Sequence, residues 1–493
     1  MRAPVLLLLR PASLLAALTL LGTAACGPSS TSSRSPGTTP AALPTGPVGH
    51  SGRWLTDAQG RVLLVHGVNM VEKAAPYEPG PAGFTAADAT WLADHGFRAV
   101  RLGVLPTGLM PTPGVIDQAY LDSIASTVSL LDKAGILTLI DYHQDGWGPS
   151  IGDDGFPAWM TLTGTAINNH AVFPLYYAKD PAIQQAFQSF WDDAPGPGGV
   201  GLQEEMTAMY GAVARRFAAD PGVLGYDLLN EPWPGTTWTA CAQDLAGCPG
   251  LDQSELGAFS AKAVTAIRGA GDHHLILGEP FVLFNFGHPT TSVPVPGGDP
   301  NAGLSFHLYT ITTGAEPTVL SDAEAWSART GGVLLNTEWG ASQDPAAIHR
   351  QAGELDSALL PWLFWSFDGE MVPKLAAPPT GTNVATAAVD ALTEAYPLAV
   401  AGTPAASSFD PTARTLLFSW STARPAGGTY PAGTLTTFET PSSLYPAGYT
   451  VTGTGFTVTS AACAPTLTVT AQAGASSGSI RITPGGTCPA SGG

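Results

Sequence analysis

Residues 224–232 read LGYDLLNEP and residues 332–340 read GVLLNTEWG, so that in each an apolar run leads into a glutamate, Glu231 or Glu338. Near-continuous runs rich in Leu and β-branched residues are typical of parallel strands buried on both faces. Six further runs have the same character: residues 62–70 (VLLVHGVNM), 99–104 (AVRLGV), 137–143 (LTLIDYH), 275–280 (LILGEP), 303–309 (GLSFHLY) and 362–368 (WLFWSFD). The sequence therefore predicts eight parallel strands.

Helix-like segments separate these runs, for example residues 85–95 (with Thr85 as the N-cap), 116–134, 203–219 and 254–269. Eight strands that alternate with helices predict an α/β fold, the (β/α)8 TIM barrel. Enzymes with this fold carry their active site at the carboxyl ends of the strands. Polar and aromatic residues gather towards those ends here: Asn69, Arg101, His143, Glu231, His307, Glu338 and Trp365.

The chain divides into four parts by composition. Residues 1–25 have an early Arg2 followed by a short apolar stretch, which is typical of an export signal peptide. Residues 26–50 are rich in Ser, Thr, Pro and Gly and predict a tether. Residues 51–398 hold the barrel, and residues 399–493, with Thr- and Val-rich runs between Gly/Pro turns, predict an antiparallel β-sandwich.

The five cysteines indicate an extracytoplasmic protein. Cys241 and Cys248 form one local pair, and Cys463 and Cys488 form another; outside the cytoplasm such pairs favour disulfides. Cys26 follows the signal-like segment at a position that resembles a bacterial lipobox, so we expect lipid attachment there; the alternative is that it simply ends a cleaved signal. We expect the protein to be secreted or anchored to the outer face of the cell membrane.

The charge balance excludes one class of partner. The formal net charge is −19, and only 12% of residues are charged. Nucleic acid requires a basic surface, so we expect no nucleic-acid partner. We further expect a monomer, with no cofactor and no metal, because no His/Asp/Glu cluster has clear ligand spacing.

Glu231 and Glu338 have the chemistry that glycoside cleavage requires. The reaction uses two carboxyl groups that face each other across the scissile bond, one protonated and one ionised. Strands four and seven of a closed barrel would bring both glutamates to the same mouth. The alternative is that each is a rim residue in an ion pair.

With Asn230-Glu231-Pro232 and Thr337-Glu338-Trp339-Gly340, the chain resembles the retaining hydrolases of glycoside hydrolase family 5. The resemblance implies that Glu231 is the acid/base and Glu338 the nucleophile, with their carboxyl groups about 5–5.5 Å apart.

The resemblance also implies roles for supporting residues. Arg101 and Tyr309 would hold Glu338, His307 would position Glu231, and Asn230 would bind a sugar 2-hydroxyl. Trp365 would stack on a sugar, and His143 matches the family's histidine of strand three. Any one of these residues, taken alone, could be an ordinary core group.

The segment DYHQDGWG (residues 141–148) with GFPAW (155–159) resembles the endoglycoceramidase branch of the family. That branch releases an intact oligosaccharide from ceramide. The resemblance implies that Gln144 and Asp145 bind the sugar next to ceramide and that Lys73 contacts a sugar further out. The alternative for Lys73 is a solvated surface lysine.

Two segments could bind the lipid part of such a substrate, because exposed apolar surface on the rim usually marks a binding site. They are residues 281–286 (FVLFNF) and 172–177 (VFPLYY). The alternative is that these side chains pack beneath long loops.

Three functions remain open from the sequence. The first is a retaining endoglycosidase that cleaves the β-glycosidic bond between oligosaccharide and ceramide in glycosphingolipids, with a membrane surface as a further partner. The second is a family 5 endo-β-glucanase, mannanase or other β-glycosidase, which acts on a polysaccharide or on a lipid or phenolic glycoside. The third is a carbohydrate-binding lipoprotein without turnover.

Overall fold

A computed structural model describes residues 44, 46–173, 175–243, 247–287, 292–309, 316–486 and 488. The predicted signal segment, most of the tether and Cys26 lie outside these residues. Within them, no helix combines the length and the apolar character needed to cross a membrane.

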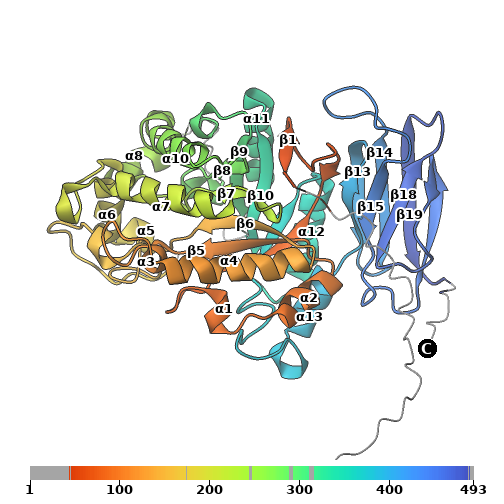
Figure 1. Cartoon of the computed structure of the whole chain (residues 1–493), viewed down its shortest axis with the longest axis horizontal. Helices are drawn as coiled ribbons and strands as arrows, with labels where there is room; N and C mark the ends of the chain where they lie inside the picture. Colours follow the sequence, from red (N-terminus) through yellow and green to blue (C-terminus); the bar gives the residue numbers. More distant parts are fainter. Residues whose placement is uncertain are drawn as a thin grey trace, which may run out of the picture. The chain divides into compact units, whose positions relative to one another are not determined.

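The predicted barrel is present, and its eight strands are all parallel (Figure 1). The strands follow one another around a closed ring in the order β10-β11-β4-β5-β6-β7-β8-β9. They are β4 (His66–Met70), β5 (Ala99–Val104), β6 (Leu137–Tyr142), β7 (Val223–Asp227), β8 (Leu275–Gly278), β9 (Ala302–Leu308), β10 (Val333–Gly340) and β11 (Trp362–Trp365). Each overlaps one of the eight runs identified in the sequence, and only β7 and β9 begin one residue before their runs.

Helices connect the strands and bury an apolar face against them. The longer ones are α2 (Ala86–Asp94), α4 (Gln118–Lys133), α6 (Pro181–Trp191), α7 (Leu202–Phe217), α10 (Ala258–Gly269), α11 (Glu316–Thr330), α12 (Pro345–Ser357) and α13 (Thr386–Leu392). Shorter ones are α1 (Pro79–Ala82), α3 (Pro106–Leu109), α5 (Tyr176–Lys179), α8 (Trp238–Gln243) and α9 (Pro249–Leu251). Helix α2 begins after Thr85, as predicted, because the Asp88 carboxylate accepts the Thr85 backbone N–H at 2.7 Å.

The C-terminal region forms two antiparallel sheets, as predicted. One has the order β13-β14-β19-β16, and its strands are β13 (Thr403–Asp410), β14 (Thr415–Ser421), β19 (Ser477–Pro484) and β16 (Tyr449–Thr454). The other contains β12 (Tyr396–Val400), β15 (Leu435–Glu439), β18 (Thr466–Ala471) and β17 (Phe456–Val458).

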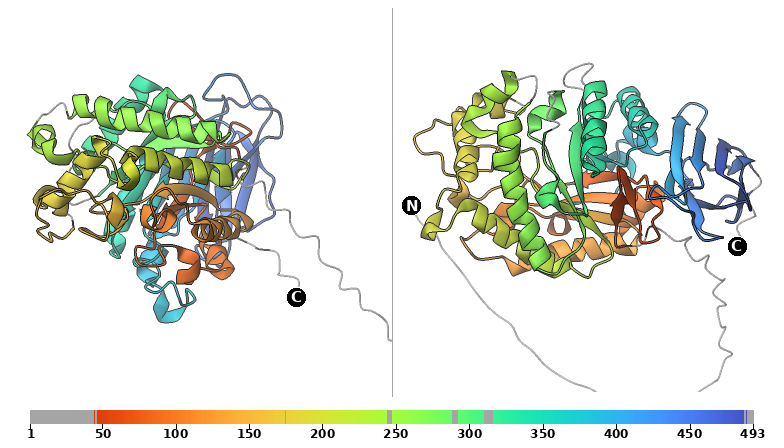
Figure 2. Two further views of the ribbon diagram at one scale, coloured as in Figure 1. Left: turned by 60° about the vertical axis from the view of Figure 1, so that its left-hand side comes forward. Right: turned by 90° about the horizontal axis from the view of Figure 1, so that it is seen from above.

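This second sheet also takes in strands from the start of the described chain: β1 (Gly49–Ser51), β2 (Trp54–Thr56) and β3 (Val62–Leu63). Strand β3 pairs antiparallel with β12, so segments more than 300 residues apart are neighbours (Figures 1 and 2). The apolar run 62–70 therefore contributes to two sheets, since its first residues leave the barrel. The limits proposed for the four parts of the chain stay a prediction, but residues 49–63 belong to the C-terminal sheet.

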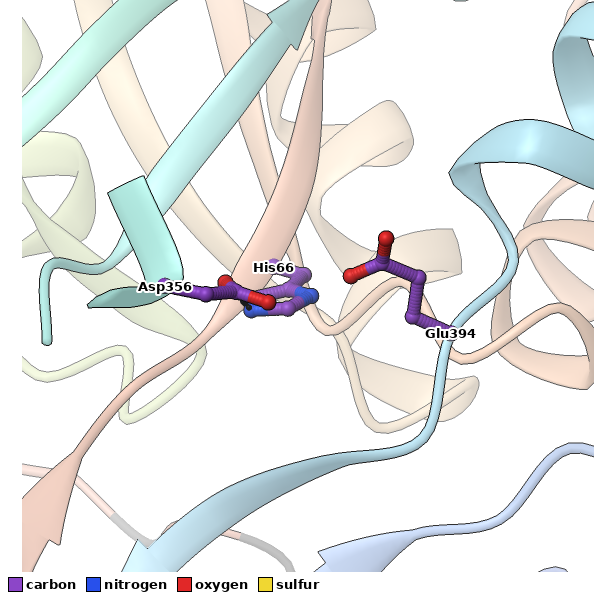
Figure 3. Close-up of side chains that lie close together, drawn as sticks. All are labelled: His66, Asp356 and Glu394. Atoms are coloured by element: carbon purple, nitrogen blue, oxygen red, sulfur yellow. Dashed lines mark ion pairs between the residues drawn. The ribbon is translucent and has the colours of Figure 1, made fainter. Parts of the chain in front are cut away.

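Three buried side chains meet between the barrel and the segment that leads to the C-terminal sheets (Figure 3). His66, at the start of β4, is stacked between the rings of Trp362 and Tyr396, with centroids 3.9 and 3.7 Å away. Its Nε2 lies 3.2 Å from the Asp356 carboxylate, and Glu394 hydrogen-bonds to Asp356 from the other side. Burial raises the pKa of Glu394 well above its usual value, and the neighbouring Asp356 carboxyl group adds to this rise.

Candidate active site

Glu231 and Glu338 face each other at the carboxyl ends of the barrel strands. One carboxylate oxygen of each, together with a ring nitrogen of His307, lies within 4.8 Å of the others. Both glutamates are almost fully buried. This separation matches the short spacing of retaining glycosidases, about 5–5.5 Å, rather than the spacing of about 6.5–9.5 Å in inverting ones.

Glu338 is held by the two residues that the sequence assigned to it. An Arg101 guanidinium nitrogen lies 2.5 Å from Oε1, and the Tyr309 hydroxyl donates to Oε2 at 2.7 Å. A positive charge and two donors stabilise the ionised carboxylate, which is the form that attacks as a nucleophile. Arg101 is itself fully buried, so its position is fixed by the barrel interior.

Glu231 has the opposite environment. Burial raises its pKa, and the charge of Glu338 adds to this effect, whereas His307 opposes it. His307 Nδ1 lies 2.8 Å from Oε1, and the Asn285 side-chain amide donates to the same oxygen at 3.2 Å. Both contacts fall on Oε1, which leaves Oε2 to carry an acidic proton. The pair thus combines an ionised and a protonatable carboxyl group.

Asn230 lies beside Glu231 and Glu338, as predicted, and both the oxygen and the nitrogen of its side-chain amide are hydrogen-bonded. Its Oδ1 accepts from Arg101 at 2.8 Å, and its Nδ2 donates to the Gln144 carbonyl at 3.1 Å. One amide hydrogen remains for a substrate hydroxyl.

The residues assigned to more distant sugar contacts also come together. His143 bridges Asp141 (2.7 Å) and Asp145 (3.3 Å). These charges outweigh burial and raise the pKa of His143 to about 10. Its ring stacks against Trp365, with centroids 5.4 Å apart. Gln144, next to His143 in the chain, donates to the hydroxyl of the buried Tyr177 at 3.0 Å. It therefore links the sugar-contact residues to the buried aromatic side chains.

Lys73 is not a solvated surface lysine. It pairs with Asp145 and lies 3.2 Å from Asp154, and its Nζ lies 5.0 Å from the centre of the Trp365 ring. Burial would lower its pKa, but the carboxylates raise it well above the usual value. Lys73 therefore belongs to the rim of the site, beside the predicted stacking tryptophan.

Sequence reasoning missed several buried residues around Arg101 and Glu231. They are Asn69, Asp141, Asp227, Glu279 and Asn285, none of which was given a role. Asp227 Oδ2 accepts from Arg101 Nε at 3.0 Å, and Glu279 Oε1 accepts from the same guanidinium at 2.9 Å. Glu279 follows β8 directly, so its place at a strand end was a usable signal.

The two apolar segments considered for lipid binding, residues 281–286 and 172–177, differ in how far their side chains are exposed. Phe281, Val282 and Phe284 are buried, so for this segment the alternative of packed side chains holds and not that of an exposed surface. In the other segment Val172 and Phe173 are 74% and 55% exposed, and Leu175 is also exposed. Tyr176 and Tyr177 of that segment are buried. An exposed apolar surface, which we call the 172–175 loop, therefore remains.

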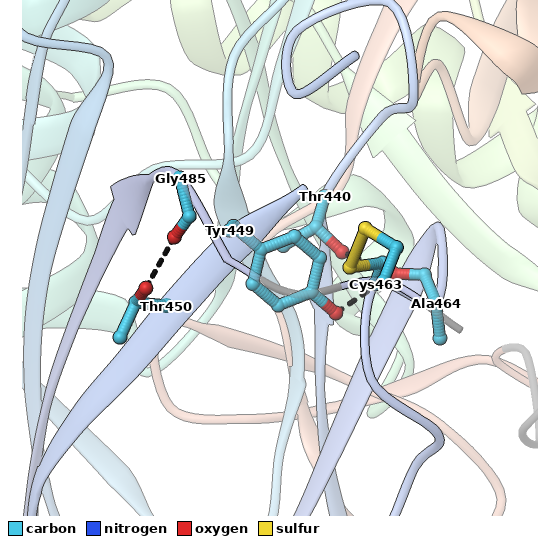
Figure 4. The surroundings of a disulfide bond; sticks show 7 residues. Thr440, Tyr449, Thr450, Cys463, Ala464 and Gly485 are labelled. Atoms are coloured by element: carbon cyan, nitrogen blue, oxygen red, sulfur yellow. Dashed lines mark hydrogen bonds between the residues drawn. A yellow bond between two sulfur atoms is a disulfide. The ribbon is translucent and has the colours of Figure 1, made fainter. Parts of the chain in front are cut away.

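Both predicted disulfides are present, Cys241–Cys248 and Cys463–Cys488. Figure 4 shows the second, close to Tyr449, whose hydroxyl donates to the Ala464 carbonyl at 2.8 Å. The first lies near the site: Trp238 of α8 contacts Trp233, and Trp233 stacks on Tyr177 with centroids 5.4 Å apart.

Comparisons with known proteins agree with this geometry. Residues 57–370 match the family described as cellulase (glycosyl hydrolase family 5), and residues 395–483 match the glycoside hydrolase family 5 C-terminal domain. Endoglycoceramidase I of Rhodococcus hoagii (strain 103S) is 32% identical over 443 residues, which cover 85% of each chain.

Two solved structures are similar in fold and in sequence. The lactosyl-enzyme intermediate of endo-glycoceramidase II from Rhodococcus sp. has a TM-score of 0.71 and 26% identity, and covers 88% of this chain and 100% of that one. A structure titled endogalactoceramidase has a TM-score of 0.68 and 25% identity, with 90% and 100% covered. The chain belongs to glycoside hydrolase family 5.

Proposed function

We propose that the protein is a retaining endoglycosidase that hydrolyses the β-glycosidic bond between oligosaccharide and ceramide in glycosphingolipids. The observation that carries the proposal is the close pair of Glu231 and Glu338 in unlike environments. The substrate class is supported by endoglycoceramidase I, which is similar along 85% of both chains.

The reaction would proceed in two displacements. Glu338 attacks the anomeric carbon and the bond from that carbon to the ceramide oxygen breaks, while Glu231 gives its proton to this leaving oxygen. Water then attacks the glycosyl-enzyme, Glu231 takes a proton from it, and the Glu338 carboxylate is released. Arg101 and Tyr309 stabilise the leaving carboxylate in the second step.

The test is an incubation of the protein with mixed glycosphingolipids, followed by mass analysis of both products. The expected products are ceramide and intact oligosaccharides, and Glu338→Gln should abolish their release. Single sugars trimmed from the far end of the glycan would contradict the endo-specificity. Greater activity on carboxymethyl-cellulose or mannan than on glycolipid would favour a polysaccharide hydrolase.

We further propose that the enzyme acts outside the cytoplasm as a lipoprotein attached through Cys26. The signal-like residues 1–25 and the paired cysteines support export. Anchoring would place the enzyme at the surface where its lipid substrate resides. Membrane fractionation of the wild type and of Cys26→Ser tests this, since the serine variant should move to the soluble fraction.

A further inference from the structure

Glu279 is a third buried carboxyl group beneath the catalytic pair, and it contacts both halves of the site. It follows β8 and is 4% exposed. Its Oε1 accepts from Arg101 at 2.9 Å and lies 3.3 Å from His307 Nε2. Its Oε2 accepts the backbone N–H of Glu231 at 2.9 Å. One side chain thus contacts the guanidinium that holds Glu338, the imidazole that contacts Glu231, and the backbone of Glu231.

The contact with the Glu231 backbone meets a conformational requirement. Glu231 has a φ of 41°, a left-handed conformation that is unfavourable for a residue with a side chain. Such a conformation persists only where neighbouring groups hold it. The hydrogen bond from the Glu231 N–H to Glu279 supplies one of these restraints.

The contact with His307 governs the charge beside Glu231. His307 Nδ1 faces Glu231 and its Nε2 faces Glu279. Although burial opposes it, the charges of Glu279 and Glu338 raise the pKa of His307 well above the usual value. His307 in turn opposes the rise in the pKa of Glu231. A change at Glu279 would therefore reach Glu231 through the imidazole.

We propose that Glu279 is a positioning residue for the acid/base, and that its single carboxyl group fixes the Glu231 backbone and sets the protonation of His307. The proposal rests on the proposed roles of Glu231 and Glu338.

Glu279 Oε1 and His307 Nε2 lie 3.3 Å apart, within ion-pair distance, so the charge of either group acts on the other. The other two groups that contact Glu279, the Arg101 guanidinium and the Glu231 N–H, are donors. Burial raises the pKa of Glu279 to about 8, whereas His307 and Arg101 oppose this rise. His307 Nδ1 meanwhile lies 2.8 Å from Glu231 Oε1.

The test compares Glu279→Gln with the wild type on an activated aryl β-lactoside and on a lactosyl glycolipid. The glutamine removes the charge that favours imidazolium, so His307 loses its proton at a lower pH and the pKa of Glu231 rises. We expect the basic limb of the kcat/KM–pH profile to move up by about one unit. We expect kcat on the glycolipid to fall about tenfold or more, with KM changed less.

Azide supplies a readout that a merely structural role would not move. Azide attacks the anomeric carbon of the glycosyl-enzyme and breaks its bond to Glu338 without any proton transfer, so it bypasses the base. We expect azide to raise the turnover of Glu279→Gln on the aryl lactoside several-fold and to yield a β-lactosyl azide.

Asp252→Asn is the matched control, because Asp252 is also buried with a pKa raised to about 6, but it binds Ser292 outside the site. This variant should keep the wild-type pH profile and show no azide effect. The proposal would be overturned if Glu279→Gln kept the wild-type kcat/KM–pH profile, lost kcat equally on both substrates and did not respond to azide.

If Glu279→Gln does not fold, Glu279→Asp carries the test. Aspartate retains the charge but has a shorter reach, so the basic limb should stay in place while kcat falls; a wild-type kcat would contradict the proposal. Failure of the proposed function has a different signature, since the wild type would then release no oligosaccharide from glycolipid, whatever the Glu279 variants do on the aryl lactoside.

Discussion

At the scale of single residues, the two catalytic candidates differ through their neighbours rather than through their own chemistry. Glu338 faces the fixed positive charge of Arg101 and the hydroxyl of Tyr309. Burial raises the pKa of Glu231, and the charge of Glu338 adds to this rise while His307 opposes it. Two glutamates of the same kind are thereby given unlike environments, as the proposed reaction requires.

The Tyr309 hydroxyl is the simplest part of this arrangement to remove. Tyr309→Phe deletes one donor to Glu338 and leaves the ring. A hydrogen bond to a charged group contributes about 1.5–3 kcal/mol, so kcat should fall about 10- to 100-fold. Steady-state kinetics check this, with Tyr430→Phe as the control, since that hydroxyl binds only the Gly60 carbonyl. Equal kinetics of Tyr309→Phe and the wild type would exclude the predicted role.

Glu394 allows a prediction for the pH dependence of stability. Its pKa in the folded protein is raised by burial and by Asp356. A raised pKa means that the neutral carboxyl contributes full stability below the unfolded pKa and that this contribution is lost as the pH rises towards the folded pKa. Glutamine keeps a neutral donor to Asp356 and does not ionise. We expect Glu394→Gln to have the higher melting temperature above about pH 5, by a margin that widens with pH.

Thermal unfolding of both proteins across the pH range checks the Glu394 prediction. The His66 and Asp356 side chains lie in the same cluster, so His66→Gln serves as the control for a general change of packing (Figure 3). A difference in melting temperature between Glu394→Gln and the wild type that does not change with pH would contradict the raised pKa of Glu394.

At the scale of elements, the 172–175 loop presents three exposed apolar side chains, those of Val172, Phe173 and Leu175. It follows β6 in the chain, after the segment with His143, Gln144 and Asp145, and its exposed side chains pass directly into the buried Tyr176 and Tyr177. Tyr177 reaches the site through Gln144. The loop is thus joined to the residues assigned to the sugar next to ceramide.

A lipid-binding role for this loop predicts a substrate-dependent effect. Val172→Ser with Phe173→Ser removes two exposed apolar groups, and the loss of about 1.4 kcal/mol of surface binding would lower kcat/KM on glycolipid in vesicles roughly tenfold. Activity on a soluble aryl lactoside should not change. The control pair is Leu417→Ser with Val458→Ser, which lies on the C-terminal strands and is also exposed. Equal losses on both substrates would point to damage of the fold instead.

At the scale of the whole molecule, a buried ion pair joins the barrel to the C-terminal sheets. Arg98 precedes β5, and its Nε and a terminal nitrogen bind the two Glu439 oxygens at 2.9 and 3.1 Å. Removing one partner of such a pair costs about 3–5 kcal/mol, because the other charge stays buried and unpaired.

We therefore expect Arg98→Ala to lower the free energy of unfolding of both regions together. Replacing both partners by leucine should cost less than the single change. Denaturant unfolding, followed by tryptophan fluorescence, measures both. Loss of the C-terminal transition alone, with the barrel unaffected, would show that the two regions unfold independently.

Sequence patterns predicted the barrel because buried parallel strands leave long apolar runs, and each of the eight runs overlaps its strand. They predicted the carboxyl pair for the same reason, since Glu231 and Glu338 close two of those runs. They missed Glu279 and Asp227, whose role depends on contacts with Arg101 across the barrel. The position of Glu279 at the end of a strand was a usable signal for a site residue, but no local pattern identifies its contact with Arg101.

The patterns also could not assign β3 to its sheet. Val62 and Leu63 read as part of the first barrel strand, and only the pairing with β12 separates them from it. That pairing links residues more than 300 positions apart, which a local run of hydrophobicity cannot report.

The pairing of β3 with β12 has a consequence for how the protein is made. Strand β3 emerges from the ribosome long before residues 396–400, so one of its two hydrogen-bonding partners, β12, does not yet exist. While synthesis continues, the middle of the chain can fold, but the pairing of β3 with β12 cannot form until residues 396–400 have been made. The segment that carries β12 is therefore needed to complete a sheet that begins near residue 49.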